Sequence, residues 1–245
     1  MAGGLSLVPM MNFRLIETKY LIDISGLSAL AYIRERPEEI EIGASQTQAD
    51  VLTWPKLVKS VPLLSLAMPH IGHFQTRSRG TVCGSIAHAD PSSELPLCLA
   101  TLGGSVVLQS ERASRVVQAE EFQIGMLATA RQPDEMVTSV RFPVRKPGTG
   151  YAFAEMAQRH GDFAVCAVAA VVSGTAVRLG VGGVADKPTV REWPALAHAE
   201  IEDALNDFAW DLGGSDDIQA SAVYRRDLVR RLGRRVIEEA RKCSS

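Results

Sequence analysis

The 245-residue sequence lacks several features that would place it in common functional classes. Lys and Arg (26) do not outnumber Asp and Glu (28), so no basic excess is available to face a phosphate backbone. The four cysteines form no C-x-x-C pair, which excludes the usual iron–sulfur spacing and is typical of buried thiols in a reducing compartment. No apolar run approaches the ~18 residues of a membrane span, and no basic stretch marks a secretory signal. We therefore expect a cytoplasmic protein with no nucleic-acid partner and no membrane span.

The composition is that of a globular protein, with 46% hydrophobic and 22% charged residues. Lys, Pro and Gly cluster at 145–150 and predict a boundary between a first domain, 1–146, and a second domain, 150–245. In the first domain a helix is predicted over Ala49–Ser60. Runs rich in β-formers and bounded by turn residues predict strands at Tyr20–Ile24, Ile40–Ala44, Ser105–Gln109 and Met136–Phe142.

The second domain has a different pattern. Three consecutive apolar runs, Tyr151–Met156, Val165–Ser173 and Ala176–Val181, predict the strands of an antiparallel meander. Helices are predicted over Glu200–Trp210 and Ala220–Arg241, the latter from apolar residues that recur at helical spacing among Arg and Glu. This half of the chain is therefore predicted to be a sheet covered by helices.

Two glycine-containing segments carry the first functional signal. They are Ala2–Leu7 (AGGLSL) and Arg79–Ser85 (RGTVCGS). Glycines let the backbone turn so that consecutive N–H groups point into one concavity, where they bind phosphate, and Ser and Thr hydroxyls add donors. Two such segments facing each other hold a pyrophosphate without Lys or Arg. Each segment taken alone is more often a simple turn.

Taken in order, these segments and others resemble a known family. The segments are AGGLSLVPMMNFRL, IGHFQTRSRGTVCGSIAHADPSSELP, FAEMAQRHGDFAVCAVAA and, near the C-terminus, DIQASAVYRR. Together they resemble the FAD-binding medium subunit of molybdenum hydroxylases, the family of the xanthine dehydrogenase and carbon monoxide dehydrogenase flavoproteins, along essentially the whole chain. The resemblance implies an α+β fold. A two-subdomain, PCMH-like FAD-binding domain with a shortened N-terminal part would precede a three-stranded antiparallel sheet with a helical C-terminal bundle.

The resemblance also implies where FAD binds. The pyrophosphate would lie between the two glycine segments, and His88 would approach the flavin ring. Glu94 stands where relatives place an acidic residue near the cofactor; it either accepts a ribose or ribityl hydroxyl or is a solvated acid at a helix start. No catalytic acid or base is implied, because the flavin carries the redox chemistry. The predicted cofactor-binding residues are Ala2, Gly3, Gly4, Leu5, Ser6, Leu7, Thr81, Val82, Cys83, Gly84, Ser85, His88 and Glu94.

The sequence departs from the family pattern in three places. Cys83 replaces a glycine of the second segment, and its side chain either crowds the pyrophosphate or points away. A basic residue that some relatives place near the flavin would fall around Ala154 and Glu155, where no positive charge exists. Relatives carry a further βα unit before the Ala-Gly-Gly loop, whereas here Met1 directly precedes it. We expect a misplaced start, and an uncovered sheet edge in the chain as it stands.

The implied function is that of an electron relay. Electrons from two-iron two-sulfur clusters of a small partner subunit would pass to FAD in this chain and on to NAD or a quinone-type acceptor, while a large molybdopterin subunit oxidises the substrate. A flavin-free structural or assembly subunit is the alternative, which Cys83 and the short N-terminus favour. A stand-alone flavoenzyme of the vanillyl-alcohol oxidase or UDP-N-acetylmuramate reductase type is a weaker alternative, because the C-terminal region resembles the medium subunit.

The remaining histidines predict no metal site. His70, His73 and His88 match no H-x-x-x-H helix face, and no carboxylate or thiolate completes a ligand set in the sequence. The segment Arg159–Asp162 (RHGD) predicts a structural turn.

Overall fold

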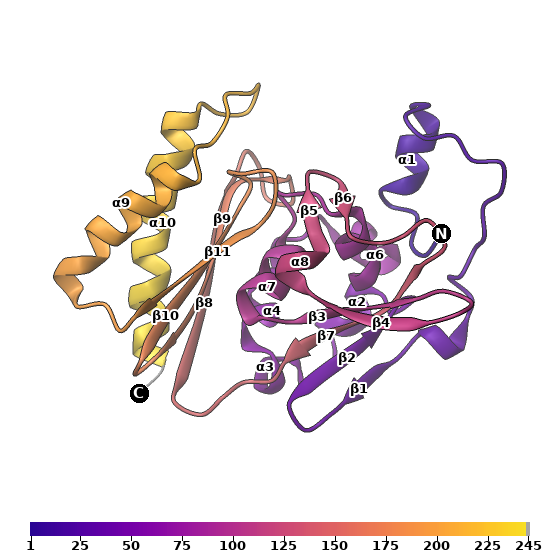
Figure 1. Cartoon of the computed structure of the whole chain (residues 1–245), viewed down its shortest axis with the longest axis horizontal. Coiled ribbons are helices and arrows are strands. Elements are labelled where there is room, and N and C mark those ends of the chain that lie inside the picture. The colour runs from indigo at the N-terminus through magenta and orange to yellow at the C-terminus, as the bar shows by residue number, and fades with distance from the viewer. Residues whose placement is uncertain (244–245) are drawn as a thin grey trace.

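The computed structural model describes residues 1–243, which form two antiparallel sheets separated by helices (Figure 1). The first sheet has five strands in the order β1-β2-β7-β3-β4. Every neighbouring pair in this sheet is antiparallel. Its strands are β1 (Ile33–Glu35), β2 (Glu39–Gly43), β3 (Ser105–Gln109), β4 (Ser114–Gln118) and β7 (Met136–Pro143). A separate two-stranded sheet pairs β5 (Gln123–Gly125) with β6 (Ala128–Thr129).

Short helices accompany the first sheet, and one of them, α7 (Glu94–Leu102), lies between the two sheets. Both of its sides meet apolar neighbours, so a helix that is apolar all round is stable there. Contact with the second sheet is close, since a Cβ on Gly180 would lie 2.0 Å from the Thr101 hydroxyl. The other helices are α1 (Leu7–Asn12), η1 (Ser28–Leu30), α2 (Gln48–Leu52), α3 (Leu57–Ser60), α4 (Pro62–Ala67), η2 (Met68–His70), α5 (Phe74–Arg79), α6 (Val82–His88) and α8 (Ala119–Phe122).

The second sheet has four strands in the order β11-β10-β9-β8. Helices cover its far face, as the orange and yellow end of the chain in Figure 1 shows. Strand β9 is apolar almost throughout, because one of its faces packs on α7 and the other on α10. The elements of this half are β8 (Thr149–Ala157), β9 (Ala164–Ser173), β10 (Ala176–Gly182), β11 (Thr189–Pro194), η3 (His198–Glu200), α9 (Ile201–Asp211) and α10 (Ala222–Cys243).

Most of the predicted elements are present, and the C-terminal sheet has one strand more than expected. Strand β11 extends the meander at its edge, where its side chains are mostly half-buried or exposed. The sequence of β11 (TVREWP) is mixed and polar, so no apolar run predicts this strand. Edge strand β4 (SRVVQ) also has a mixed sequence. The segment between β7 and β8 joins the two sheets, and dividing the chain into domains at this segment remains our proposal.

Two predicted elements are wrong. Tyr20–Ile24 is not a strand: Tyr20 and Ile22 are 86% and 75% exposed, and no strand pairs with this segment within residues 1–243. Its backbone instead makes isolated hydrogen bonds, among them two with Met1 and one from the Ser45 hydroxyl to the Ile24 carbonyl. A β-rich sequence without a ladder partner does not form a sheet. The single helix over Ala49–Ser60 is two short helices, α2 and α3, with a break that includes Pro55, which lacks an N–H to continue the first helix.

No helix within residues 1–243 is long and apolar enough to cross a membrane. A cytoplasmic location stays a prediction of the sequence.

Candidate cofactor site

A cavity of about 660 Å³ opens between the N-terminal segment, α5, α6 and the turn before β9. Its size is within the range of roughly 300–1,000 Å³ that holds small molecules and cofactors. All the residues predicted from the sequence line it except Val82 and Cys83. The lining residues are Met1, Ala2, Gly3, Gly4, Leu5, Ser6, Leu7, Met10, Ile16, Gln48, Ile71, Gly72, Thr76, Gly80, Thr81, Gly84, Ser85, Ala87, His88, Ser93, Glu94, Leu127, Arg131, Gly161, Asp162 and Phe163.

The two glycine segments touch each other through their backbones. A Cβ atom on Gly3 would lie 2.1 Å from the Arg79 carbonyl oxygen and 2.9 Å from Cα of Gly80, so only glycine fits. Gly4 has φ +77°, a left-handed conformation that other residues rarely adopt, and its carbonyl accepts the Val8 N–H at the start of α1. The sequence pattern thus predicts a contact between segments almost 80 residues apart, and the structure contains it.

The second glycine segment is mostly the first turn of α6. Thr81 precedes this helix, and its hydroxyl accepts the N–H of Gly84 at 3.0 Å, a standard N-terminal cap. Val82 and Cys83 are buried in the core. The Cys83 thiol donates to the Ile42 carbonyl at 3.4 Å, and burial raises its pKa. Of the two placements left open by the sequence, the Cys83 side chain takes the one that points away from the cavity.

Gln48 is a cavity residue that sequence reasoning misses. It is 4% exposed, its N–H donates to the Gly80 carbonyl at 2.8 Å, and its side-chain Nε2 reaches the Thr81 carbonyl at 3.5 Å. Its Oε1 is buried and has no hydrogen-bond partner among the described residues. A buried, unpaired amide oxygen is costly, so this atom is available to a ligand donor. No motif marks a lone glutamine at a helix start, and only the fold brings it to the glycine segments.

Glu94 is buried, which rules out its reading as a solvated acid. It is the first residue of α7 and only 7% exposed. Burial, together with the negative charge of Glu155, raises the pKa of its carboxyl to about 7. The cavity wall therefore has a carboxyl that holds a proton at neutral pH in a large fraction of molecules.

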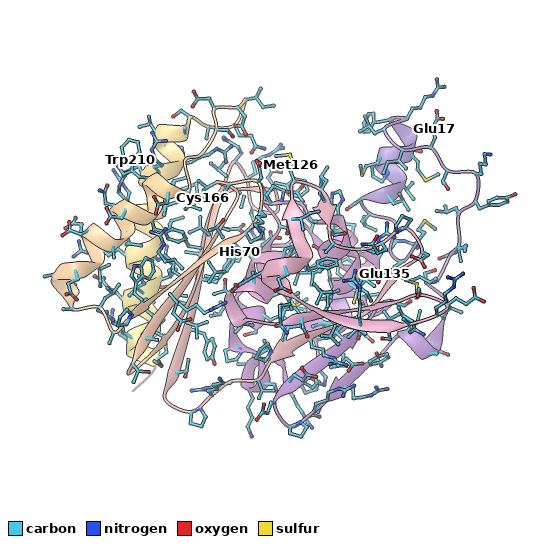
Figure 2. All side chains as sticks on the ribbon, viewed as in Figure 1. Glu17, His70, Met126, Glu135, Cys166 and Trp210 are labelled. Atoms are coloured by element: carbon cyan, nitrogen blue, oxygen red, sulfur yellow. The ribbon has the colours of Figure 1, made fainter. Side chains whose placement is uncertain are left out.

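A histidine pairs with Glu155, at the position where the sequence has no positive charge. Nδ1 of His70 lies 3.3 Å from Oε1 of Glu155, and this hydrogen bond raises the pKa of His70. Figure 2 shows His70 at the junction of the two halves of the chain. His88 lines the cavity, whereas His73 is exposed beside it. No group of His, Cys, Asp and Glu within the described residues could hold a metal ion.

The turn before β9 closes one side of the cavity. Arg159 and Asp162 pair at 3.0 Å across the predicted turn, and Phe163 is a half-exposed aromatic ring on the wall. Gly161 presses on the opposite wall, since a Cβ there would lie 2.9 Å from the Gly72 carbonyl oxygen. On another side Arg131 adds a positive charge that the sequence reading did not assign to the site.

We expect Gly161→Ala to destabilise the protein by about 2 kcal/mol, as the sum of a left-handed φ (+85°) and a steric clash. Gly148→Ala is the matched control, because Gly148 has φ +66° but no atom of residues 1–243 lies within 4 Å of its Cβ position. The control should lose only about 1 kcal/mol of unfolding free energy, the cost of placing alanine at a left-handed φ. Chemical denaturation of both variants measures the difference, and equal losses would mean that the Gly161 contact adds nothing.

Comparison with known proteins identifies the class. Residues 1–145 match the family described as "FAD binding domain in molybdopterin dehydrogenase". The chain is 37% identical to the nicotine 6-hydroxylase medium subunit of Paenarthrobacter nicotinovorans, over 98% of this chain and 88% of that protein. It is 31% identical to the glyceraldehyde dehydrogenase medium chain of Sulfolobus acidocaldarius, over 98% and 89%. The chain therefore belongs to the FAD-binding family of molybdopterin dehydrogenases.

Solved structures agree with this assignment. Quinoline 2-oxidoreductase from Pseudomonas putida 86 superposes with a TM-score of 0.92 at 30% identity, covering all of this chain and 89% of that one. Carbon monoxide dehydrogenase from Hydrogenophaga pseudoflava gives 0.86 at 29% identity, covering 98% and 88%. Within its family the chain is of the medium-subunit type, the FAD-binding component of multi-subunit molybdenum hydroxylases, and its enzyme class is oxidoreductase.

Proposed function

We propose that the 660 Å³ cavity binds FAD, and that the chain relays electrons from a partner's iron–sulfur clusters to NAD or a quinone-type acceptor. The observation that carries the proposal is the backbone contact between the two glycine segments at the cavity wall. A dinucleotide pyrophosphate needs closely spaced N–H and hydroxyl donors, and Ala2–Leu7 and Thr81–Ser85 supply them from two sides.

The residues present fit this cofactor. Because Gly3 has no Cβ, the first glycine segment can contact the backbone of the second. The Cys83 side chain points into the core and so does not occupy the cavity. The unpaired Oε1 of Gln48 can accept a hydrogen bond from a ligand donor. Arg131 lines the cavity and is positively charged, which favours a proposed ligand that is a dianion at its pyrophosphate.

FAD when bound supplies the redox chemistry, and the chain supplies position and environment. The segments Ala2–Leu7 and Thr81–Ser85 would hold the pyrophosphate, and Gln48 and Glu94 are placed to bind hydroxyl groups. Phe163 and Leu127 contribute apolar surface that excludes water from the cavity. None of these roles requires a catalytic acid or base in direct contact with a substrate.

The proposed partners are a large molybdopterin subunit and a small iron–sulfur subunit, in a hetero-oligomer. Support comes from the relatives. One is named as a subunit of a dehydrogenase complex, and another is a carbon monoxide dehydrogenase that lacks the Mo-pyranopterin moiety of its molybdenum cofactor. Reoxidation of the reduced protein by NAD and by a quinone, followed separately, tells the two acceptors apart.

The test is a visible absorption spectrum of the purified chain, alone and co-expressed with its partner subunits, followed by titration of flavin-free protein with FAD. We expect flavin bands and saturable binding. Gln48→Leu should weaken FAD binding about tenfold, the effect of one hydrogen bond to a buried amide, whereas Gln75→Leu on the exposed part of α5 should not. Absence of flavin and of FAD binding, even with partners present, would leave the alternative of a structural or assembly subunit.

A further inference from the structure

Two residues beside the cavity have a left-handed backbone although neither is glycine. Leu127, in the two-residue turn between β5 and β6, has φ +53°, and Ala89, at the C-terminal end of α6, has φ +57°. Glycine or asparagine is usual at a left-handed turn position, and glycine is usual at a left-handed helix end. Because any other side chain is costly there, its presence beside a cavity points to a function of that side chain.

Hydrogen bonds fix the Leu127 turn to the end of α6. The N–H of Leu127 donates to the Ala89 carbonyl at 3.0 Å. The same carbonyl accepts a second hydrogen bond, at 2.7 Å, from the side-chain Nε2 of Gln123 on β5. Ala89 and Gln123 are both buried, with 0% and 5% of their surface exposed. The turn is therefore attached to the core, and these bonds keep Leu127 in its left-handed conformation.

Leu127 lies where a ring of the proposed ligand is expected. It lines the cavity, and 49% of its surface is exposed, so apolar surface is available to a ligand. The proposed pyrophosphate donors of Thr81–Ser85 are at the start of α6, whereas Leu127 is bonded to the end of that helix. The seven residues of α6 span about 10 Å. A sugar or ribityl chain separates each ring of FAD from the pyrophosphate, so a ring is expected at such a distance.

We propose that Leu127 is an apolar contact for the flavin ring, and that its fixed, left-handed turn holds the side chain against that ring. Of the two rings of FAD, the flavin is the one that exchanges electrons with other molecules, so it is the ring expected beside a half-exposed residue. The leucine side chain replaces water on the ring and adds no charge. This assignment rests on the proposed function, because it requires FAD in the cavity.

Leu127→Asn in the full chain tests the contact. Asparagine is similar in size and adopts a left-handed φ readily, so this change removes the apolar surface and does not destabilise the turn. Fluorescence titration should show an FAD affinity about tenfold lower, because about half of a leucine side chain is no longer available for burial. Thermal unfolding of the flavin-free variant should give a midpoint no lower than that of wild type. Leu127→Met keeps an apolar side chain and should bind FAD nearly as tightly as wild type does.

Visible circular dichroism at saturating FAD separates a flavin contact from an adenine contact, because only the flavin absorbs visible light. Leu127→Asn should change this spectrum, which a loss of turn stability alone would not do.

Met126→Asn is the matched control. Met126, labelled in Figure 2, is the other residue of the turn; it is 60% exposed and is not among the described residues that line the cavity, so affinity and spectrum should match wild type. Wild-type affinity in Leu127→Asn, or weaker binding with an unchanged spectrum, overturns the flavin contact. A wild-type chain that binds no FAD overturns the proposed function and the contact together, and this failure is visible without any variant.

Discussion

Gly3→Ala is expected to lower FAD affinity at least 100-fold, about 2.7 kcal/mol. The added methyl group would lie 2.1 Å from the Arg79 carbonyl oxygen, 2.8 Å from its carbon and 2.9 Å from Cα of Gly80. All three atoms belong to the backbone, so no side chain can swing aside. The N-terminal segment must move away from the start of α6, and the donors from the two segments then no longer converge on one pyrophosphate.

Gly26→Ala is the matched control for this variant. Gly26 lies on the same N-terminal stretch, its φ is not positive, and no atom in the described part of the chain lies within 4 Å of its Cβ position. Fluorescence titration with FAD measures both variants, and thermal unfolding establishes that each one folds. If Gly3→Ala binds FAD as wild type does, the contact between the glycine segments has no part in binding; if Gly26→Ala loses affinity equally, the loss reflects the stretch as a whole.

The candidate site could be predicted where local pattern decides the structure. Gly3 and Gly4 stand out because they are glycines in a short segment, and the close approach and positive φ found there are what glycine permits. Strands β3 and β9 are apolar on both faces, so their sequences alone identify them. Long-range packing decides the rest. Gln48 gains its position from helices and strands far away in the sequence, and it lies in no recognisable motif.

The wrong strand and the question that the sequence leaves open at Cys83 have the same origin. Tyr20–Ile24 has the composition of a strand, but strand formation depends on a neighbouring strand, and none within residues 1–243 pairs with this segment. Cys83 looks like an intruder in a phosphate-binding loop, yet helix geometry turns it towards Ile42 while Gly84 and Ser85 face the cavity. In both cases tertiary contacts decide the outcome: they determine whether Tyr20–Ile24 forms a strand, and they determine which way the Cys83 side chain points.

Arg225→Met is expected to destabilise the protein by about 4 kcal/mol, the largest single effect on stability. Arg225 is 3% exposed, and its guanidinium donates to the carbonyls of Val165 at 2.6 Å and Gly183 at 2.5 Å and to the Asp217 carboxylate at 2.6 Å. Methionine fills similar volume but donates nothing, so two inward-facing carbonyls lose their charged donor. The cost arises from these carbonyls more than from Asp217, which is half-exposed.

The effect should extend to the cavity wall. The Gly183 N–H donates to the Pro91 carbonyl at 2.8 Å, and Pro91 precedes Ser93 and Glu94 on the wall, so Arg225 joins the C-terminal helix to the start of α7. Arg231→Met is the matched control: Arg231 is on the same helix, its side chain is 77% exposed and it pairs with Asp227, a surface contact that contributes about 0.5 kcal/mol. Urea unfolding followed by tryptophan fluorescence compares the two. Equal urea midpoints for the two variants would show that the buried Arg225 guanidinium contributes no more to stability than the exposed Arg231. The connection from α10 to the cavity wall would then not stabilise the protein.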